Sequence, residues 1–221
     1  MAEIRALIFD MDGVIIHSNP WHRIAWAEYT RRHGVDMTDA MQQRMYGRRN
    51  DEIIRDFLGQ HLDDQEVFAH GAAKEDLYRE LMRPRAAESL VPGVREFLDR
   101  YRNLDLAVAT NAEAANVDFV LDGAGLRSLF RIVVNGHQVT HAKPHPEIYL
   151  RVAEELRVPP ESCVVFEDSH TGVESGLAAG MRVIGVGTTH DTLPGVSLWI
   201  VDFNDPALES WLGHAAAAAF L

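Results

Sequence analysis

The chain has 221 residues, of which 47% are hydrophobic, a composition typical of a globular protein with a substantial core. Its formal net charge of −12 argues against nucleic acid or an anionic membrane surface as a partner, because no basic field would attract either. A negatively charged substrate must therefore be held by a few cations placed locally.

The first apolar run is too short for a secretion signal or a membrane-spanning helix, since it covers residues 6–9 and Asp10 follows at once. The single cysteine, Cys163, has no partner for an intramolecular disulfide and lies in an apolar run, where we expect it to be buried and inert. These features favour a cytoplasmic protein.

Short apolar segments recur along the chain and are predicted to be strands. They cover residues 6–9, 104–109, 132–134, 163–166, 182–186 and 198–201. Amphipathic stretches of helical length separate most of them, at residues 94–102, 114–124 and 146–156. This alternation predicts an α/β fold with a doubly wound, Rossmann-like parallel sheet. In such a sheet the ligand site lies beyond the carboxyl ends of the strands.

Residues 18–87 interrupt the alternation, because they hold helical patterns and no convincing strand. The predicted helices cover residues 21–32, 39–45, 51–58 and 65–82. Inserted after the first strand, this block would lie above the strand ends. We therefore predict an α/β core of residues 1–17 and 88–221 and an inserted helical cap domain of residues 18–87. The alanine-rich run 215–219 is expected to be a terminal helical turn or a frayed tail.

Two pairs of acidic residues directly follow predicted strands. Asp10 and Asp12 follow the first strand, and Glu167 and Asp168 follow the fourth. Carboxylates this close repel one another unless a cation or a shared proton relieves them, and Mg²⁺ suits such oxygen ligands. Taken alone, the first pair is equally compatible with a helix cap at Asp10 and a simple turn at Asp12 and Gly13.

Further polar side chains are predicted at the same edge. Thr110 and Asn111 follow the second strand at the start of a helix, where an anion is stabilised. Lys143 precedes a proline, which favours an extended backbone. Only Lys143 and Lys74 are lysines among 21 basic residues, so each could be present for its compact charge, which arginine does not reproduce. The alternative is a chance position on a solvated face.

In their order and spacing these motifs resemble those of the haloacid dehalogenase superfamily of phosphotransferases, in the branch with a helical cap after the first motif. The matching motifs are Asp10-x-Asp12-Gly13-Val14, Thr110-Asn111, Lys143-Pro144 and Glu167-Asp168. The resemblance implies a Mg²⁺-dependent, two-step phosphoryl transfer with Asp10 as the nucleophile and Asp12 as the acid and base. Because halide leaves without a proton donor, Asp12 favours phosphoryl transfer over dehalogenation.

The resemblance also implies roles for the other motif residues. Asp10, Asp168 and the carbonyl group of Asp12 would bind Mg²⁺, and Glu167 would orient a metal-bound water. Lys143 would hold the charges of the nucleophile and the phosphate together. Thr110, Asn111 and Gly13 would lie against the phosphate. A Schiff base at Lys74, as in phosphonatases, is disfavoured by its position late in the cap.

The pattern most resembles beta-phosphoglucomutase and its sugar-phosphate phosphatase relatives. His22 and Lys74 fall where the mutase cap engages its sugar phosphate and acid/base. Asn50, however, stands where the mutase carries an arginine for the distal phosphate, and Ala112 and Ala114 replace a serine and an asparagine. These losses favour a phosphatase acting on a small phosphomonoester, such as a sugar or polyol phosphate.

Several alternatives stay open at this point. A phosphomutase is the second hypothesis, provided that Arg48 or Arg49 replaces the missing arginine. Both arginines could instead lie in a solvated turn, and His22 could simply pack or cap within its helix. A non-catalytic protein that binds phosphorylated metabolites is less favoured, because every residue that the chemistry needs is present. We expect a monomer whose partner is the small-molecule substrate.

Overall fold

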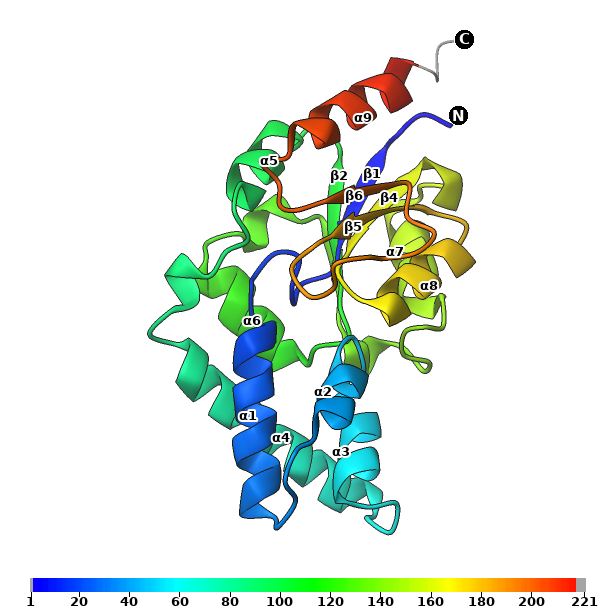
Figure 1. The fold of residues 1–221 in the computed structure, drawn as a ribbon. Coiled ribbons are helices and arrows are strands. Elements are labelled where there is room, and N and C mark those ends of the chain that lie inside the picture. Colours follow the sequence, from blue (N-terminus) through cyan, green and yellow to red (C-terminus); the bar gives the residue numbers. More distant parts are fainter. Residues whose placement is uncertain (1, 218–221) are drawn as a thin grey trace.

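The computed structural model describes residues 2–217 and has an α/β fold (Figure 1). Within this range, six strands form one parallel sheet in the order β3-β2-β1-β4-β5-β6. They are β1 (Ala6–Phe9), β2 (Asp105–Ala109), β3 (Ile132–Val134), β4 (Cys163–Glu167), β5 (Arg182–Val186) and β6 (Leu198–Ile200). The predicted fold class is confirmed, and each predicted strand is present with its ends shifted by at most one residue.

The strand order reverses between β1 and β4, and a sheet of this kind binds ligands at such a switch point. The register aligns Phe9 of β1 with Val108 of β2 and with Phe166 of β4. The polar residues that follow these three strands therefore leave the sheet side by side at the same edge.

Alternate side chains of β1 face two different hydrophobic layers. The helices of the core are α5 (Val94–Arg100), α6 (Ala114–Gly123), α7 (Glu147–Leu156), α8 (His170–Ala178) and α9 (Pro206–Ala217). Leu7 and Phe9 pack with α5, α6 and α9, whereas Ala6 and Ile8 pack with α7 and α8. Phe9 also stacks on Phe166, with ring centroids 4.8 Å apart. This burial on both faces fixes the end of β1, from which Asp10 projects.

Four helices lie between β1 and α5, as predicted: α1 (Asn19–Arg32), α2 (Asp39–Met45), α3 (Asn50–Leu58) and α4 (Asp64–Met82). Figure 1 shows them grouped apart from the sheet, beyond one end of its strands. They enclose a small core of their own, formed by Trp26, Tyr29, Met45, Ile53, Ile54, Phe57 and Val67. The helix α1 begins two residues earlier than predicted, because Pro20 fits its first turn. The cap boundaries at residues 18 and 87 stay a prediction.

Neither α8 nor α9 was predicted from the sequence. Residues 215–217 of the alanine-rich run belong to α9, and residues 218 and 219 lie outside the described range. Short 3-10 turns occur at Ala86–Glu88, Arg127–Leu129, Gly136–Gln138 and Pro160–Ser162. Among residues 2–217, no helix combines the length and the apolar character needed to cross a membrane.

Candidate active site

Three buried carboxylates meet at the carboxyl edge of the sheet. Asp10, Glu167 and Asp168 each place an oxygen within 4.8 Å of the others. Burial raises the pKa of Asp10 to about 7, and the Glu167 and Asp12 charges add to this effect against the opposing charge of Lys143. Burial, together with the charges of Glu167 and Asp10, also raises the pKa of Asp168 well above its usual value. The ionised cluster therefore lacks enough positive charge, which fits a divalent cation.

The carboxylate of Asp168 is held in place for such a role. Asn19 donates a hydrogen bond of 2.8 Å to its Oδ2, and the Thr189 hydroxyl donates to the same oxygen. Gly13, at φ +81°, lies so close that an added Cβ would stand 1.9 Å from that oxygen. The Gly13 amide donates to the carbonyl of Ile16, so its predicted contact with phosphate stays a prediction. An all-oxygen site with acidic residues fits Mg²⁺.

Lys143 neutralises part of this acidic cluster from inside the protein. Its Nζ donates to Asp10 Oδ1 at 2.7 Å, to Glu167 Oε1 at 2.7 Å and to the Ala109 carbonyl at 2.9 Å. All three ammonium protons are thus engaged, although the residue is only 2% exposed. Burial alone would lower the pKa of Lys143, but the charges of Asp10 and Glu167 raise it. The lysine is therefore charged and fixed.

Glu167 holds Lys143 in this position. Its Oε1 also accepts a 2.7 Å hydrogen bond from the Tyr149 hydroxyl. Its Oε2 accepts from the backbone amides of Asp168 and Ser169 and from the Ser169 hydroxyl. A carboxylate offers about four acceptor positions, so this one is fully occupied by protein donors. The predicted orientation of a metal-bound water by Glu167 stays a prediction.

A chain of polar contacts runs from Asp12 into the cap. Asp12 Oδ1 accepts from the Ser18 hydroxyl at 2.6 Å and lies 3.3 Å from His22 Nε2. The other ring nitrogen of His22, Nδ1, lies 2.8 Å from Lys74 Nζ. The imidazole also stacks on Tyr78, with ring centroids 3.7 Å apart. Burial opposes ionisation of Asp12, but His22 and Ser18 outweigh it, and its pKa is lowered.

This chain ends at Glu75, a buried carboxylate that the sequence analysis did not single out. Its Oε1 accepts from Lys74 at 2.7 Å and from Asn50 at 2.8 Å, and its Oε2 accepts from Asn116 at 2.7 Å. Burial would raise the pKa of Glu75, but the charges of Lys74 and His22 lower it to about 2. An ionised carboxylate therefore joins α3 and α4 of the cap to α6 of the core.

Thr110 and Asn111 line the same cavity as the acidic cluster. The Thr110 hydroxyl accepts the amide proton of Ala112 at 3.2 Å. The side-chain amide of Asn111 donates to the Gly47 carbonyl at 2.8 Å. Its buried Oδ1 has no hydrogen-bond partner within the part of the chain that the structure describes. That oxygen is available to a donor group of a ligand.

Most of the predicted site residues surround one small cavity of about 70 Å³ between the strand ends and the cap. Those that line it are Asp10, Asp12, His22, Arg48, Lys74, Thr110, Asn111, Lys143, Glu167 and Asp168. Gly13 and Arg49 do not line it. The polar lining residues that were not predicted from the sequence are Asn19, Glu75, Asn116 and Ser169. The sequence signal for Glu75 was its position beside a rare lysine.

Arg48 and Arg49 are already paired with acidic side chains. Arg48 donates to Glu52 at 3.2 Å and to Asp56 at 3.1 Å, so its guanidinium group is held away from the acidic cluster although the residue lines the cavity. Arg49 lies 3.2 Å from Asp51 and lines a separate cavity. In both arginines, part of the positive charge is already balanced by an acidic neighbour.

The chain is similar to a known protein family and to several known proteins. The model of the haloacid dehalogenase-like hydrolase family matches residues 4–180. A phosphorylated carbohydrates phosphatase of Thermotoga maritima is 35% identical over 83% of this chain and 85% of its own. A beta-phosphoglucomutase of Bacillus subtilis is 27% identical over 93% of each chain.

Among solved structures, a beta-phosphoglucomutase from Clostridium difficile superposes with a TM-score of 0.87 and covers 98% of this chain and 99% of its own, at 24% identity. This likeness confirms the capped fold. The family match confirms the resemblance found in the sequence, and the phosphatase named among the relatives supports the predicted enzyme class.

Proposed function

Because this chain belongs to the haloacid dehalogenase-like hydrolases, we propose that it is a Mg²⁺-dependent phosphatase of a small phosphorylated sugar or polyol. The observation that carries the proposal is the 2.7 Å contact between Lys143 and Asp10 beside the buried carboxylate of Asp168. In this contact the ammonium group of Lys143 balances the charge of Asp10, the proposed nucleophile. Asp10 also belongs to the carboxylate cluster that fits a divalent cation. The named activity of the Thermotoga maritima relative supports the substrate class.

In the first step, a carboxylate oxygen of Asp10 attacks the phosphorus and forms a phosphorus–oxygen bond, giving an aspartyl phosphate. The bond to the sugar oxygen breaks, and Asp12 gives its proton to that oxygen. Asp12 has a lowered pKa in the free protein. A phosphate dianion beside it raises this pKa by like-charge repulsion, which supplies the protonated form that the step requires.

In the second step, water attacks the same phosphorus. Asp12, now ionised, takes a proton from the water, and the bond between Asp10 and phosphorus breaks. Inorganic phosphate leaves and the Asp10 carboxylate is restored. The two aspartates need to address opposite sides of one phosphorus, and their spacing of two residues at the end of β1 serves this purpose.

The remaining residues position these groups. Lys143, which Glu167 holds in place, fixes the Asp10 carboxylate. His22 with Lys74 directs the carboxylate of Asp12. Bound by Asp10, Asp168 and the Asp12 carbonyl group, Mg²⁺ would neutralise charge on the phosphoryl oxygens. Thr110 and Asn111 are proposed to contact those oxygens.

The cap end of the cavity favours a phosphatase over a phosphomutase. A mutase has to hold a second phosphate there, but the ionised Glu75 would repel it. Asn50 donates to Glu75 instead of offering the arginine charge of the mutase. An uncharged hydroxyl group suits this end better, because the ionised Glu75 does not repel it. The mutase alternative requires Arg48 or Arg49 to reach the second phosphate, and Arg48 is held by Glu52 and Asp56.

The proposal is tested by measuring phosphate release from a panel of sugar and polyol phosphates, with Mg²⁺ and with a chelator. We expect release only with Mg²⁺, and a loss of several orders of magnitude in Asp10→Asn. The matched control is Asp36→Asn, which changes an exposed aspartate of the cap. Unchanged turnover in Asp10→Asn, or equal turnover in chelator, would overturn the proposal. We further expect a cytoplasmic monomer that binds neither nucleic acid nor membranes.

A further inference from the structure

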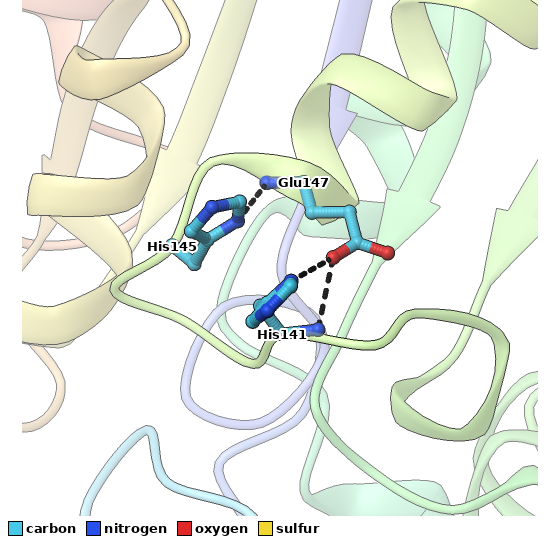
Figure 2. A group of neighbouring side chains, drawn as sticks. All are labelled: His141, His145 and Glu147. Atoms are coloured by element: carbon cyan, nitrogen blue, oxygen red, sulfur yellow. Dashed lines mark hydrogen bonds and ion pairs between the residues drawn. The ribbon is translucent and has the colours of Figure 1, made fainter.

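A second cluster of metal-binding side chains lies outside the catalytic cavity, in the loop that leads into α7. His141, His145 and Glu147 each place a ligand atom within 4.8 Å of the others (Figure 2). His141 Nδ1 lies 2.9 Å from Glu147 Oε2, and the two imidazole rings have centroids 4.6 Å apart. Both histidines are exposed, so an ion can reach the cluster from solvent.

This cluster differs from the acidic one in its donor atoms, because two of its three residues are histidines. Imidazole nitrogen favours zinc, copper, nickel and cobalt, whereas Mg²⁺ prefers oxygen and retains its water. Two donors about 2.1 Å from one ion lie about 3.0 Å apart at a right angle and about 3.4 Å apart at the tetrahedral angle. The 2.9 Å separation of His141 Nδ1 and Glu147 Oε2 is close to this range. His145 is exposed, so rotation of its side chain can bring a ring nitrogen to the same ion.

The ligand atoms are also prepared for a cation. The backbone amides of Thr140 and His141 donate to the two oxygens of Glu147 at 2.8 and 2.9 Å. These bonds, with the His141 side chain, lower the pKa of Glu147 to about 2, so its carboxylate is ionised. His145 Nδ1 accepts the amide proton of Glu147 at 3.2 Å, and this nitrogen would exchange that bond for one to the ion.

The loop backbone between the ligands is anchored from two sides. The Ser175 hydroxyl of α8 donates to the His145 carbonyl at 2.8 Å. Lys143, between the two histidines in sequence, is tied to Asp10 and Glu167 at the sheet edge. Such anchoring lowers the cost of ordering the ligands around an ion.

We propose that His141, His145 and Glu147 form a second metal site, selective for a zinc-class divalent ion, with its remaining positions filled by water. An ion bound there ties together the backbone on both sides of Lys143. Occupancy should therefore stabilise the loop that carries this catalytic lysine and raise the thermal midpoint of the whole chain.

Titration calorimetry with Zn²⁺, at a saturating Mg²⁺ concentration, tests the proposal. We expect one zinc ion per chain, with affinity reduced by more than about tenfold in His141→Ala and in His145→Ala. The control is His137→Ala, an exposed histidine outside the cluster, which should bind zinc as the unaltered chain does. The three substitutions change exposed side chains, and circular dichroism verifies the fold.

Zinc should also raise the melting temperature of the unaltered chain and of His137→Ala, but not of the His141→Ala/His145→Ala double variant. Equal zinc affinity in the double variant and the unaltered chain would overturn the proposal, as would the absence of any binding to the unaltered chain. Because both readouts measure binding, they are independent of phosphatase activity. A negative result would leave the proposed reaction untouched.

Discussion

Lys143 Nζ donates a 2.7 Å hydrogen bond to Asp10 Oδ1 across 133 positions of sequence, and both side chains are buried. The same ammonium group bonds Glu167, so one compact cation balances two carboxylates at the end of adjacent strands. This contact explains why the chain keeps a lysine here while using arginine at nearly every other basic position.

Replacing Lys143 by arginine should lower kcat by about 100-fold or more, although the charge is kept. A planar guanidinium group is too large for the position at which Nζ bonds Asp10, Glu167 and Ala109 simultaneously. Steady-state kinetics checks this result. Arg23→Lys, an exchange on the exposed face of α1, should change kcat by less than about twofold. A fully active Lys143→Arg enzyme would show that the compact charge is unnecessary.

Removing Lys74, the other lysine, should lower the stability of the fold. Lys74→Met leaves the buried Glu75 carboxylate without its closest cation, which should cost about 3–5 kcal/mol of unfolding free energy. Adding Glu75→Gln to that variant removes the uncompensated charge, so the double variant should be more stable than Lys74→Met. Urea denaturation measures both. Simple addition of the two single effects would mean that the side chains are not coupled.

The ionised state of Glu75 also predicts a dependence of stability on pH. Its pKa falls from the usual 4.5 to about 2 in the folded protein, which corresponds to about 3 kcal/mol of stabilisation at neutral pH. Because the folded-state pKa is the lower one, this contribution is complete above the unfolded-state value and is lost as pH falls from about 4.5 towards 2.

Glu75→Gln lacks this titration. The difference in unfolding free energy between the unaltered chain and Glu75→Gln should therefore change in favour of the variant as pH is lowered from 5 to 3. Denaturant unfolding at several pH values gives this difference directly, and other carboxylates cancel because both chains contain them. A difference independent of pH would contradict the low pKa assigned to Glu75.

Asn50 tests the argument against a mutase. Asn50→Arg should place a cation beside Glu75 and offset its repulsion of a second phosphate, so a sugar bisphosphate should inhibit this variant more strongly than the unaltered enzyme, by about tenfold. Asn50→Gln, which keeps an uncharged amide, is the matched control. Equal inhibition constants in the three enzymes would show that the cap end of the cavity does not sense the second phosphate.

The core of the fold and the strand-end residues were predictable because their signals are local. Apolar runs mark the strands. Because the strands are parallel, Asp10, Thr110, Glu167 and Asp168 lie at one edge of the sheet, whatever the packing of the helices. Lys143 was predictable from the scarcity of lysine. The roles of these residues came from the family resemblance.

The cap contacts were not predictable to the same degree, because they depend on how helices pack against each other. Arg48 is four residues from Glu52, a spacing visible in the sequence, but its pairing with Asp56 required the fold of α3. Nothing local links Glu75 to Asn116, which lies in α6 of the core, 41 positions away. Long-range side-chain pairs of this kind determine which substrate fits, and a single sequence does not reveal them.

Phosphorus NMR tests the central claim most directly. The purified enzyme, with Mg²⁺, is given beta-glucose 1-phosphate with a trace of the 1,6-bisphosphate, and other sugar phosphates in parallel. A phosphatase predicts growth of the inorganic phosphate signal as the substrate signal declines, and no growth in Asp10→Asn. Conversion of glucose 1-phosphate to glucose 6-phosphate without inorganic phosphate would contradict the claim and would establish a mutase.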